Sequence, residues 1–331
     1  MSNYIAFDLG GPLKQPRKVN DLLQLVSDGS KVLEIAERYD EQLLRTKTPE
    51  HEPGDIPVLM LIILLLLGGT KEADITRVAS ESTLTPGALA LVTGLLTDGW
   101  RVFCITTEYE QYAIHITHKF GIYAHNVAST PIPLDSMHTL VTKQETAVFR
   151  QAIDSIVALS SSDVVQIKQT LDRFFSADLP TTVIGKQIRQ IKPVRGRRKT
   201  DALKRFAEKY QEPLSKWVVV GDSIADADML AQVDSQGGLA VAFNGGRHTL
   251  SSATLGLAST HISDLKDILQ AWKKGGRKEA KRLVQEKEKR GGVGDRAHFH
   301  WLAERDRING IDDVIALHAR IGQVGVDSAG T

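Results

Sequence analysis

The stretch WVVVGDSIADADML, residues 217–230, decides the fold. Its apolar, β-branched start at residues 217–220 is followed by Gly221 and Asp222, and helical spacing continues over residues 226–233. A short apolar run that stops at a glycine and passes into a helix is typical of a buried parallel strand with its crossover helix. The stretch therefore predicts an α/β fold in which Asp222 stands at the carboxyl end of a strand.

Three further apolar runs predict strands of the same sheet, at residues 4–7, 101–105 and 239–243. The first run ends at Asp8 and the second at Thr106. Between the runs apolar residues recur with helical spacing, and the predicted helices cover residues 85–98, 108–120 and 199–210. This alternation of strands and helices predicts a doubly wound parallel sheet with helices on both faces.

Two helical insertions interrupt the predicted core. The core comprises residues 1–13, 86–131 and 193–272. The first cap insertion covers residues 14–85, the second covers residues 132–192, and a charged helical extension covers residues 273–331. Within the first insertion, helical spacing is present over residues 20–44 and 75–80.

An apolar run and a charged run stand out from the rest of the chain. Residues 58–67 are ten apolar residues, which is too few to span a bilayer because a spanning helix needs roughly 20. We expect a helix buried within protein or at a subunit contact. Residues 273–296 are rich in lysine and arginine and predict a solvated helix with a flexible break at Gly291, Gly292 and Gly294, with an anion-binding arm as the alternative.

The composition indicates an ordinary globular protein. Of the 331 residues, 42% are hydrophobic and 24% are charged, and the net charge is +1. A chain of this kind can bury a sizeable core, and its near-zero charge argues against a nucleic-acid partner. The single cysteine, Cys104, excludes a disulfide within the chain and is expected to be a buried hydrophobe. Because the N-terminus also lacks the features of a signal peptide, we expect a cytoplasmic protein with no membrane partner.

Residues suited to binding phosphate and a metal ion stand at the ends of the predicted strands. In an open parallel sheet, ligands bind beyond the carboxyl ends of the strands, where Asp8, Thr106 and Asp222 would lie. Phosphoryl transfer needs an in-line nucleophile, a cation and donors for the phosphate oxygens. Asp8 and Asp222 offer the hard oxygens that Mg²⁺ prefers, Asp226 lies one helical turn further on, and Lys199 adds a positive charge.

Each of these signals has a plain structural alternative. FDLGGP, residues 7–12, also fits an ordinary turn after a strand, and Lys199 alone fits a solvated helix position. The Gly-Asp pair of residues 221–222 also fits a capped helix start. Histidines at positions 115, 118 and 125 leave open a zinc site, although partly exposed helix positions explain them as well. The four signals together, in this order, favour the shared site.

Four stretches carry a family resemblance. FDLGGP, VFCITTEYEQYA, GRRKTDALKRF and VVVGDSIADADML resemble, in order, the four motifs of the haloacid dehalogenase (HAD) superfamily. The resemblance covers the core and hardly touches the insertions. The core also looks like that of phosphoserine-phosphatase-like and sugar-phosphatase-like members. ITTEYEQYA, with LDRFF in the second insertion, resembles more narrowly an archaeal-type group named energy-converting hydrogenase A subunit R.

The resemblance implies a role for each residue of the reaction. Asp8 would be the nucleophile that forms an aspartyl-phosphate. Thr106, with Thr107 beside it, would bind the phosphoryl group of the substrate. Lys199 would pair with Asp8 and the phosphate. The two insertions match the two cap positions of the family, so the substrate would be a small phosphomonoester whose size the caps limit.

The resemblance also implies a magnesium site, with one departure. Asp8, Asp222 and the backbone carbonyl of Gly10 would ligate Mg²⁺, with Asp226 as the adjacent acidic ligand. Phosphatases of the family carry a second aspartate, the general acid and base, at the place that Gly10 occupies here. Losing such a group costs about 10²–10⁴-fold in rate. The residues after Thr106 offer no strong substitute; these are Glu108, Tyr109, His115 and His118.

The sequence therefore predicts a Mg²⁺-dependent phosphohydrolase that acts through an aspartyl-phosphate at Asp8. Gly10 makes its turnover doubtful. The alternative is a catalytically weakened protein that binds metal and phosphate in a regulatory role or as part of a complex. A homo-oligomer or a subunit of a larger assembly fits both hypotheses.

Overall fold

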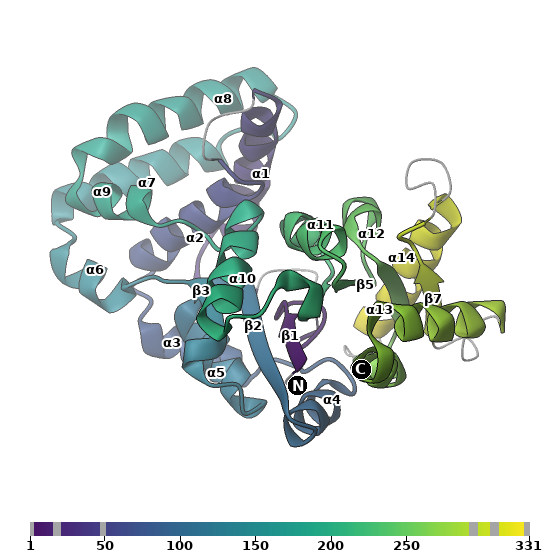
Figure 1. Cartoon of the computed structure of the whole chain (residues 1–331). Helices are drawn as coiled ribbons and strands as arrows, with labels where there is room; N and C mark the ends of the chain where they lie inside the picture. The colour runs from purple at the N-terminus through teal and green to yellow at the C-terminus, as the bar shows by residue number, and fades with distance from the viewer. Residues whose placement is uncertain (1–2, 16–20, 47–50, 291–296, 305–310, 328–331) are drawn as a thin grey trace.

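A seven-stranded sheet forms the centre of the molecule (Figure 1). The computed structural model describes residues 3–15, 21–46, 51–290, 297–304 and 311–327. The strand order is β3-β2-β1-β4-β5-β6-β7, and each neighbouring pair is parallel except β6 and β7. The strands are β1 (Asn3–Phe7), β2 (Trp100–Tyr109), β3 (Val127–Thr130), β4 (Trp217–Gly221), β5 (Leu239–Phe243), β6 (Leu255–Ser259) and β7 (Ala297–Trp301).

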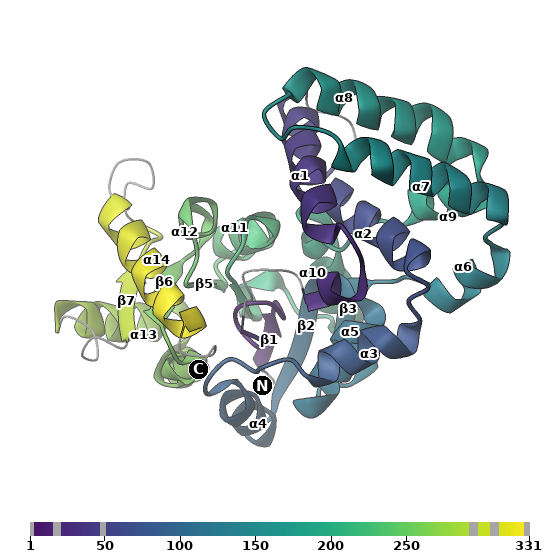
Figure 2. The same cartoon turned by 180° about the vertical axis from the view of Figure 1, so that it is seen from behind.

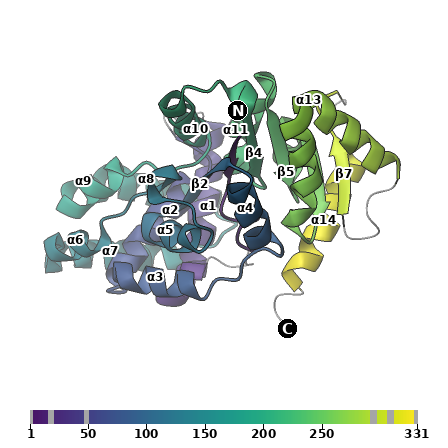
Figure 3. The same ribbon diagram turned by 60° about the horizontal axis from the view of Figure 1, so that its bottom comes forward.

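Helices cover both faces of the sheet, which confirms the predicted doubly wound fold. Alternate residues of a strand point to opposite faces. Ile5 and Phe7 of β1 therefore pack in one core cluster with α4 and α5, while Tyr4 and Ala6 pack in another with α10 and α11 (Figure 3). These helices are α4 (Ala88–Thr97), α5 (Glu110–Lys119), α10 (Arg197–Tyr210) and α11 (Ala227–Ser235).

The two insertions form one helical cap. Helix α1 of the first insertion packs against α2, α7 and α8, and α2 contacts α6 and α7 (Figure 2). The hydroxyl of Tyr39 in α1 donates to Asp172 in α8 at 2.7 Å, which ties the insertions together. The cap helices are α1 (Gly29–Arg45), α2 (Asp55–Leu67), α6 (Leu134–Leu140), α7 (Lys143–Val157), α8 (Val164–Arg173) and α9 (Val183–Gln190).

Helix α2 confirms the buried helix predicted for residues 58–67. Met60 through Leu66 are all buried, and α2 forms the interior of the cap. Among the described residues no single helix is long and apolar enough to cross a membrane; only α2 and α3 (Glu72–Ser80) taken together have the length and composition, and they are bent by 112°. Helix α3 packs against α5 of the core.

The C-terminal region differs from the predicted charged helical extension. Helix α13 (Lys266–Lys289) runs across the predicted boundary at residue 272, with a kink at Gly275 and Gly276. Strand β7 then pairs antiparallel with β6, and α14 (Asp312–Asp327) packs on β6. Neither strand was predicted, because β6 contains a glycine and ends in serine, and β7 lies within a charged region. Gly291, Gly292 and Gly294 lie outside the described residues.

Several predicted boundaries shift by a few residues. Strand β2 continues past Ile105 to Tyr109, so α5 begins at Glu110 rather than at Glu108. Helix α4 begins after Gly87, whose φ of 79° caps it, rather than at Pro86. The helical spacing over residues 20–44 divides into a short 3-10 helix, η1 (Asp21–Leu25), and α1; residue 20 lies outside the described part.

The strand order reverses direction at β1. Chain order runs to one side through β2 and β3 and to the other through β4 and β5, so the crevice of this fold opens between β1 and β4. Asp8 follows β1 and Asp222 follows β4. The fold therefore places both carboxylates at the point where a ligand binds in a doubly wound sheet.

Candidate functional site

The structure brings together the residues that were predicted from separate motifs. Asp8, Asp222 and Asp226 each offer an oxygen, and these oxygens lie within 4.8 Å of one another. The ammonium of Lys199 lies 3.0 Å from Asp8 Oδ1 and 2.6 Å from Asp226 Oδ1. Lys199 is fully buried, so its charge acts on these carboxylates with little screening by water.

The carboxylate of Asp8 is oriented by its own backbone. Its amide donates to Val220 O at 2.8 Å, which extends the pairing of β1 with β4 by one residue. Leu9 N and Lys199 both bond to Asp8 Oδ1. Within the described part of the chain Oδ2 has no hydrogen-bond partner, so it is the oxygen left to attack an electrophile or to bind a metal.

Asp222 is held against the loop that follows β1. Gly11 has a φ of +79°, and a Cβ there would collide with the carboxylate of Asp222. Only glycine allows this approach. Gly10, by contrast, has no positive φ, and a Cβ built on it meets nothing within 4 Å. The loop therefore has room for a side chain at position 10 and none at position 11.

Asp226 holds its neighbours in place. Oδ1 accepts from Lys199, while Oδ2 accepts from Asp222 N at 3.2 Å, Ser223 N at 3.0 Å and Ser223 Oγ at 2.9 Å. The last contacts belong to a capping box at η6 (Ile224–Asp226), which leads into α11. Both oxygens are engaged, so Asp226 orients Lys199 and the Asp222 backbone, and its role as a direct metal ligand stays a prediction.

The site carries more negative than positive charge. Burial, together with the charge of Asp226, raises the pKa of Asp8 to about 6, and Lys199 opposes this rise. Burial and the carboxylates of Asp226 and Asp8 raise the pKa of Asp222 well above its usual range. Burial lowers the pKa of Lys199, but Asp226 and Asp8 outweigh it and raise the pKa above its ordinary value. Lys199 therefore stays protonated among three carboxylates.

These residues fit a divalent cation. All available donors are carboxylate or carbonyl oxygens, which Mg²⁺ and similar hard cations prefer. A cation would also offset the negative charge of the neighbouring carboxylates, which together with burial raises the pKa of Asp8 and of Asp222. The described residues contain no other cluster with metal-ligand spacing, so the alternative zinc site at His115 and His118 gains no support.

Thr106 and Thr107, near the carboxyl end of β2, make different contacts. Thr106 is almost fully buried beside the cluster, and its Oγ1 accepts from Glu108 N at 3.3 Å. Thr107 Oγ1 donates to Val194 O at 3.1 Å, which ties β2 to the segment before α10. Both threonines line the same cavity, but the hydroxyl of Thr107 is already engaged by the backbone.

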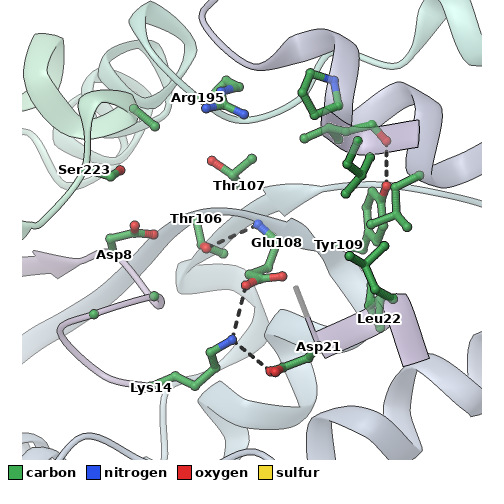
Figure 4. Close-up of a pocket in the computed structure, with 18 of the residues that line it drawn as sticks. Asp8, Lys14, Asp21, Leu22, Thr106, Thr107, Glu108, Tyr109, Arg195 and Ser223 are labelled. Carbon is green, nitrogen blue, oxygen red and sulfur yellow. Dashed lines mark hydrogen bonds and ion pairs between the residues drawn. The ribbon is translucent and has the colours of Figure 1, made fainter. Parts of the chain in front are cut away.

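A cavity of about 540 Å³ lies between the core and the cap (Figure 4). Asp8, Thr106 and Asp222 form part of its core side. The cap side comes from η1, α1 and α2. Its apolar residues are Leu22, Leu23, Leu33, Pro57, Val58 and Leu61, and its polar residues are Asp21, Ser30, Glu34 and Glu37. The cap thus lies over the predicted site, and the cavity between them is partly open to solvent.

A polar cluster that was not predicted from the sequence lies on one wall of this cavity. Lys14 Nζ lies 3.0 Å from Asp21 Oδ2, 3.2 Å from Tyr112 Oη and 3.6 Å from Glu108 Oε1. Burial lowers the pKa of Lys14, but Glu108, Tyr112 and Asp21 together raise it, so Lys14 is charged. Lys14 comes from the loop after β1 and Asp21 from η1, and no periodic pattern marks either residue.

The cap is also tied to the helix that carries Lys199. Arg198 donates through both terminal nitrogens to Asp55 at the start of α2, at 2.7 Å each. Arg197 Nε lies 2.6 Å from Glu52 Oε1. Arg195 lines the cavity and donates to Gly54 O at 2.8 Å. Three arginines within four residues, Arg195, Arg197 and Arg198, therefore tie residues 52–55 of the cap to this segment.

Comparisons with known proteins agree with this architecture. Residues 93–261 match the model of a family described as haloacid dehalogenase-like hydrolase. No curated protein matches the sequence. A solved gene product of Archaeoglobus fulgidus is similar over 100% of this chain and 98% of its own, with 20% identity and a TM-score of 0.81, and therefore shares the fold.

Two further solved structures are more distant. A phosphoserine phosphatase in apo form is 15% identical over 81% of this chain and 98% of its own, with a TM-score of 0.46. A HAD family hydrolase from Salmonella enterica serovar Typhi is 14% identical over 73% of this chain and 62% of its own, with a TM-score of 0.45. The narrower resemblance to energy-converting hydrogenase A subunit R is not tested by these matches and stays a prediction.

Proposed function

The chain belongs to the haloacid dehalogenase-like hydrolase family, and from this premise we propose that it is a Mg²⁺-dependent phosphohydrolase acting on a small phosphomonoester. One observation carries the proposal. Asp8, Asp222 and Lys199 converge at the crevice between β1 and β4, and Asp8 and Asp222 line the cavity between the core and the cap. A carboxylate nucleophile, a second carboxylate and a buried ammonium are the groups that phosphoryl transfer requires.

Asp8 would attack the phosphorus of the substrate through Oδ2, the oxygen that is left without a hydrogen bond within the described chain. Lys199 holds the other oxygen and places a positive charge beside the phosphate. Thr106 and the backbone amides near it would bind phosphate oxygens. The aspartyl-phosphate so formed would then be hydrolysed by water.

Mg²⁺ would be held by Asp8, Asp222 and the carbonyl of Gly10, with Asp226 supporting them through Lys199 and the Asp222 amide. When bound, the ion supplies positive charge that reduces repulsion between the carboxylate and the phosphate. Gly10 retains its backbone carbonyl, so the missing side chain does not remove this donor.

The cavity supports a small substrate. At about 540 Å³ it would enclose a compact organic phosphate, and the apolar residues of its cap side would contact the organic part. The near-zero net charge and the single buried cysteine support a cytoplasmic protein that acts on a small molecule rather than on nucleic acid. Association with a second copy or a larger assembly is compatible with this role.

A substrate panel tests the proposal. The purified protein is assayed against alkyl and aryl phosphomonoesters with Mg²⁺ and with a chelator. We expect Mg²⁺-dependent release of phosphate that Asp8→Asn abolishes and that Asp201→Asn, an exposed position on α10, leaves intact. Activity that persists in Asp8→Asn would contradict the proposed nucleophile.

Gly10 supports the second candidate function, a protein that binds metal and phosphate and turns over little. That candidate predicts binding of Mg²⁺ and inorganic phosphate by calorimetry, with no hydrolysis of any ester in the panel. Loss of both ligands in Asp8→Asn would still place them at the same site.

A further inference from the structure

We propose that Glu108 is the acid–base residue of this site, in the role that Gly10 leaves without a side chain. The inference rests on the proposed phosphohydrolase function. It is carried by the position of the Glu108 carboxylate, which lines the same cavity as Asp8 and Thr106 and is held there by the buried Lys14.

The extended end of β2 places Glu108 in the cavity. The pairing of β1 with β2 ends at Phe7 and Cys104, whereas β2 continues to Tyr109. The amide of Glu108 donates to Thr106 Oγ1 at 3.3 Å, so its backbone is fixed by a residue of the phosphate site. Figure 4 shows Asp8, Thr106 and Glu108 around one space.

Lys14 orients the carboxylate of Glu108 without enclosing it. Asp21 is the nearer partner of Lys14, at 3.0 Å, whereas Glu108 lies at 3.6 Å. The side chains of Lys14 and Asp21 are 7% and 3% exposed, whereas that of Glu108 is 25% exposed. Asp21 therefore balances the buried ammonium. All three residues line the cavity, and Glu108 has the more exposed of the two carboxylates.

The other polar groups near Thr106 are less suitable within the described residues. The hydroxyl of Tyr109 donates to Val58 O at 2.7 Å, which commits it to the cap. Glu34 and Glu37 also line the cavity, but they are exposed residues of α1 in the cap, whereas Glu108 lies two residues from Thr106. Asp21 is engaged by Lys14, Tyr112 and Ser82, and the two histidines of α5 do not line the cavity.

The proton that Glu108 donates in the first step is regained in the second. Asp8 bonds to phosphorus as the bond to the leaving oxygen breaks, and protonated Glu108 donates its proton to that oxygen, so that the alcohol departs. The Glu108 carboxylate then takes a proton from the water that attacks the phosphorus. The Asp8–phosphoryl bond breaks, inorganic phosphate leaves, and Glu108 is protonated again.

The dependence on the leaving group tests this role in Glu108→Gln. For an alkyl phosphate the leaving oxygen needs a proton, so we expect kcat/KM to fall by about 10²–10⁴-fold. For p-nitrophenyl phosphate, whose leaving group departs without a proton, kcat/KM should change little. Its kcat should fall, with a burst of nitrophenol, because the second step has lost its base. Glu110→Gln, an exposed neighbour at the start of α5, is the matched control.

Rescue provides a second measurement. A Cβ at position 10 meets nothing within 4 Å, so Gly10→Asp introduces a carboxyl into an open place. In the Glu108→Gln background Gly10→Asp should restore hydrolysis of the alkyl phosphate, and its effect on the wild type should be much smaller. Two residues that share one role give this non-additive pattern.

The possible results distinguish a failure of the Glu108 assignment from a failure of the proposed phosphohydrolase function. An equal loss for both esters in Glu108→Gln, or no loss, with Asp8 still essential, would overturn the assignment of Glu108 alone. Equal gains from Gly10→Asp in both backgrounds would do the same. A wild-type protein that hydrolyses neither ester, or an active Asp8→Asn variant, would overturn the proposed function and this inference with it.

Discussion

At the scale of the residue, the site is an arrangement of buried charge. Lys199 is fully buried beside Asp8, Asp222 and Asp226. Its ammonium group contacts the carboxylates of Asp8 and Asp226. Breaking such a buried pair leaves charges without compensation, which costs more than the pair itself contributes. Asp226 completes the arrangement because its second oxygen accepts from the Asp222 and Ser223 amides.

Lys199→Met should therefore destabilise the protein. We expect the free energy of unfolding in urea to fall by about 3–5 kcal/mol in the absence of a divalent cation, because three carboxylates remain with no ammonium among them. Mg²⁺ should restore part of the loss. Lys204→Met, an exposed position on the same helix, should change stability by less than about 0.5 kcal/mol. A Lys199→Met variant as stable as wild type without metal would refute this charge balance.

At the scale of the element, the segment that leads into α10 connects the core to the cap. Arg198 donates two hydrogen bonds to the carboxylate of Asp55. The side chain of Arg198 is 19% exposed and that of Asp55 is 9% exposed. A bidentate pair of this kind is stronger and more directional than a single contact. The same turn begins the helix that presents Lys199, so the position of the cap loop and that of the ammonium are linked.

A double-mutant cycle measures this link. Arg198→Gln, Asp55→Asn and the double variant should give a coupling of about 1–3 kcal/mol in the free energy of unfolding, since the pair is largely buried and bidentate. The same cycle on Arg282 and Glu286, an exposed pair on α13, should give about 0.3–0.5 kcal/mol. Similar coupling at both pairs would mean that the contact with the cap adds no stability.

Elements with strong local patterns were predictable from the sequence, and those that depend on distant partners were not. Strands β1, β2, β4 and β5 are apolar runs that end at a turn signal. Strand β6 is short and contains Gly256, where His318 of α14 packs so closely that a Cβ would lie 3.1 Å from its ring. Strand β7 forms by pairing with the free edge of β6. The local sequence of residues 297–301 does not indicate this pairing.

The candidate site divides in the same way. The motif residues were predicted because each follows a strand or opens a helix with a recognisable pattern. Lys14 and Asp21 lie in irregular segments, and only the folded chain shows that they meet Glu108 and Tyr112. The packing of the two insertions into one cap could not be predicted either, because no local sequence pattern indicates that α1 contacts α8.

At the scale of the whole molecule, the C-terminal region completes the sheet on the side away from the cap (Figure 1). His318 of α14 is fully buried, and neither ring nitrogen has a partner among the described residues. His300 of β7 faces it at 5.8 Å between ring centroids and itself lies 3.4 Å from Glu288. Burial, with His300 and His298 nearby, lowers the pKa of His318 to about 3.

Acid should therefore loosen this region. Because the folded-state pKa of His318 lies below its ordinary value of 6.5, its contribution to stability is present above pH 6.5 and is lost as the pH falls toward 3. The loss is up to about 1.4 kcal/mol per pH unit. His318→Leu should flatten the fall in unfolding free energy over this range, whereas the exposed His248→Leu should not. Parallel pH profiles for wild type and His318→Leu would contradict the buried neutral histidine.

The most direct test of the central claim is a crystal structure of the protein with Mg²⁺ and beryllofluoride, which mimics a phosphoryl group on a carboxylate. This measurement does not depend on the unknown substrate or on the rate of turnover. We predict beryllofluoride bonded to Asp8 Oδ2, contacted by Thr106 and Lys199, and Mg²⁺ bound by Asp8, Asp222 and Gly10 O. Beryllofluoride bonded elsewhere, or a metal bound away from Asp8 and Asp222, would contradict it.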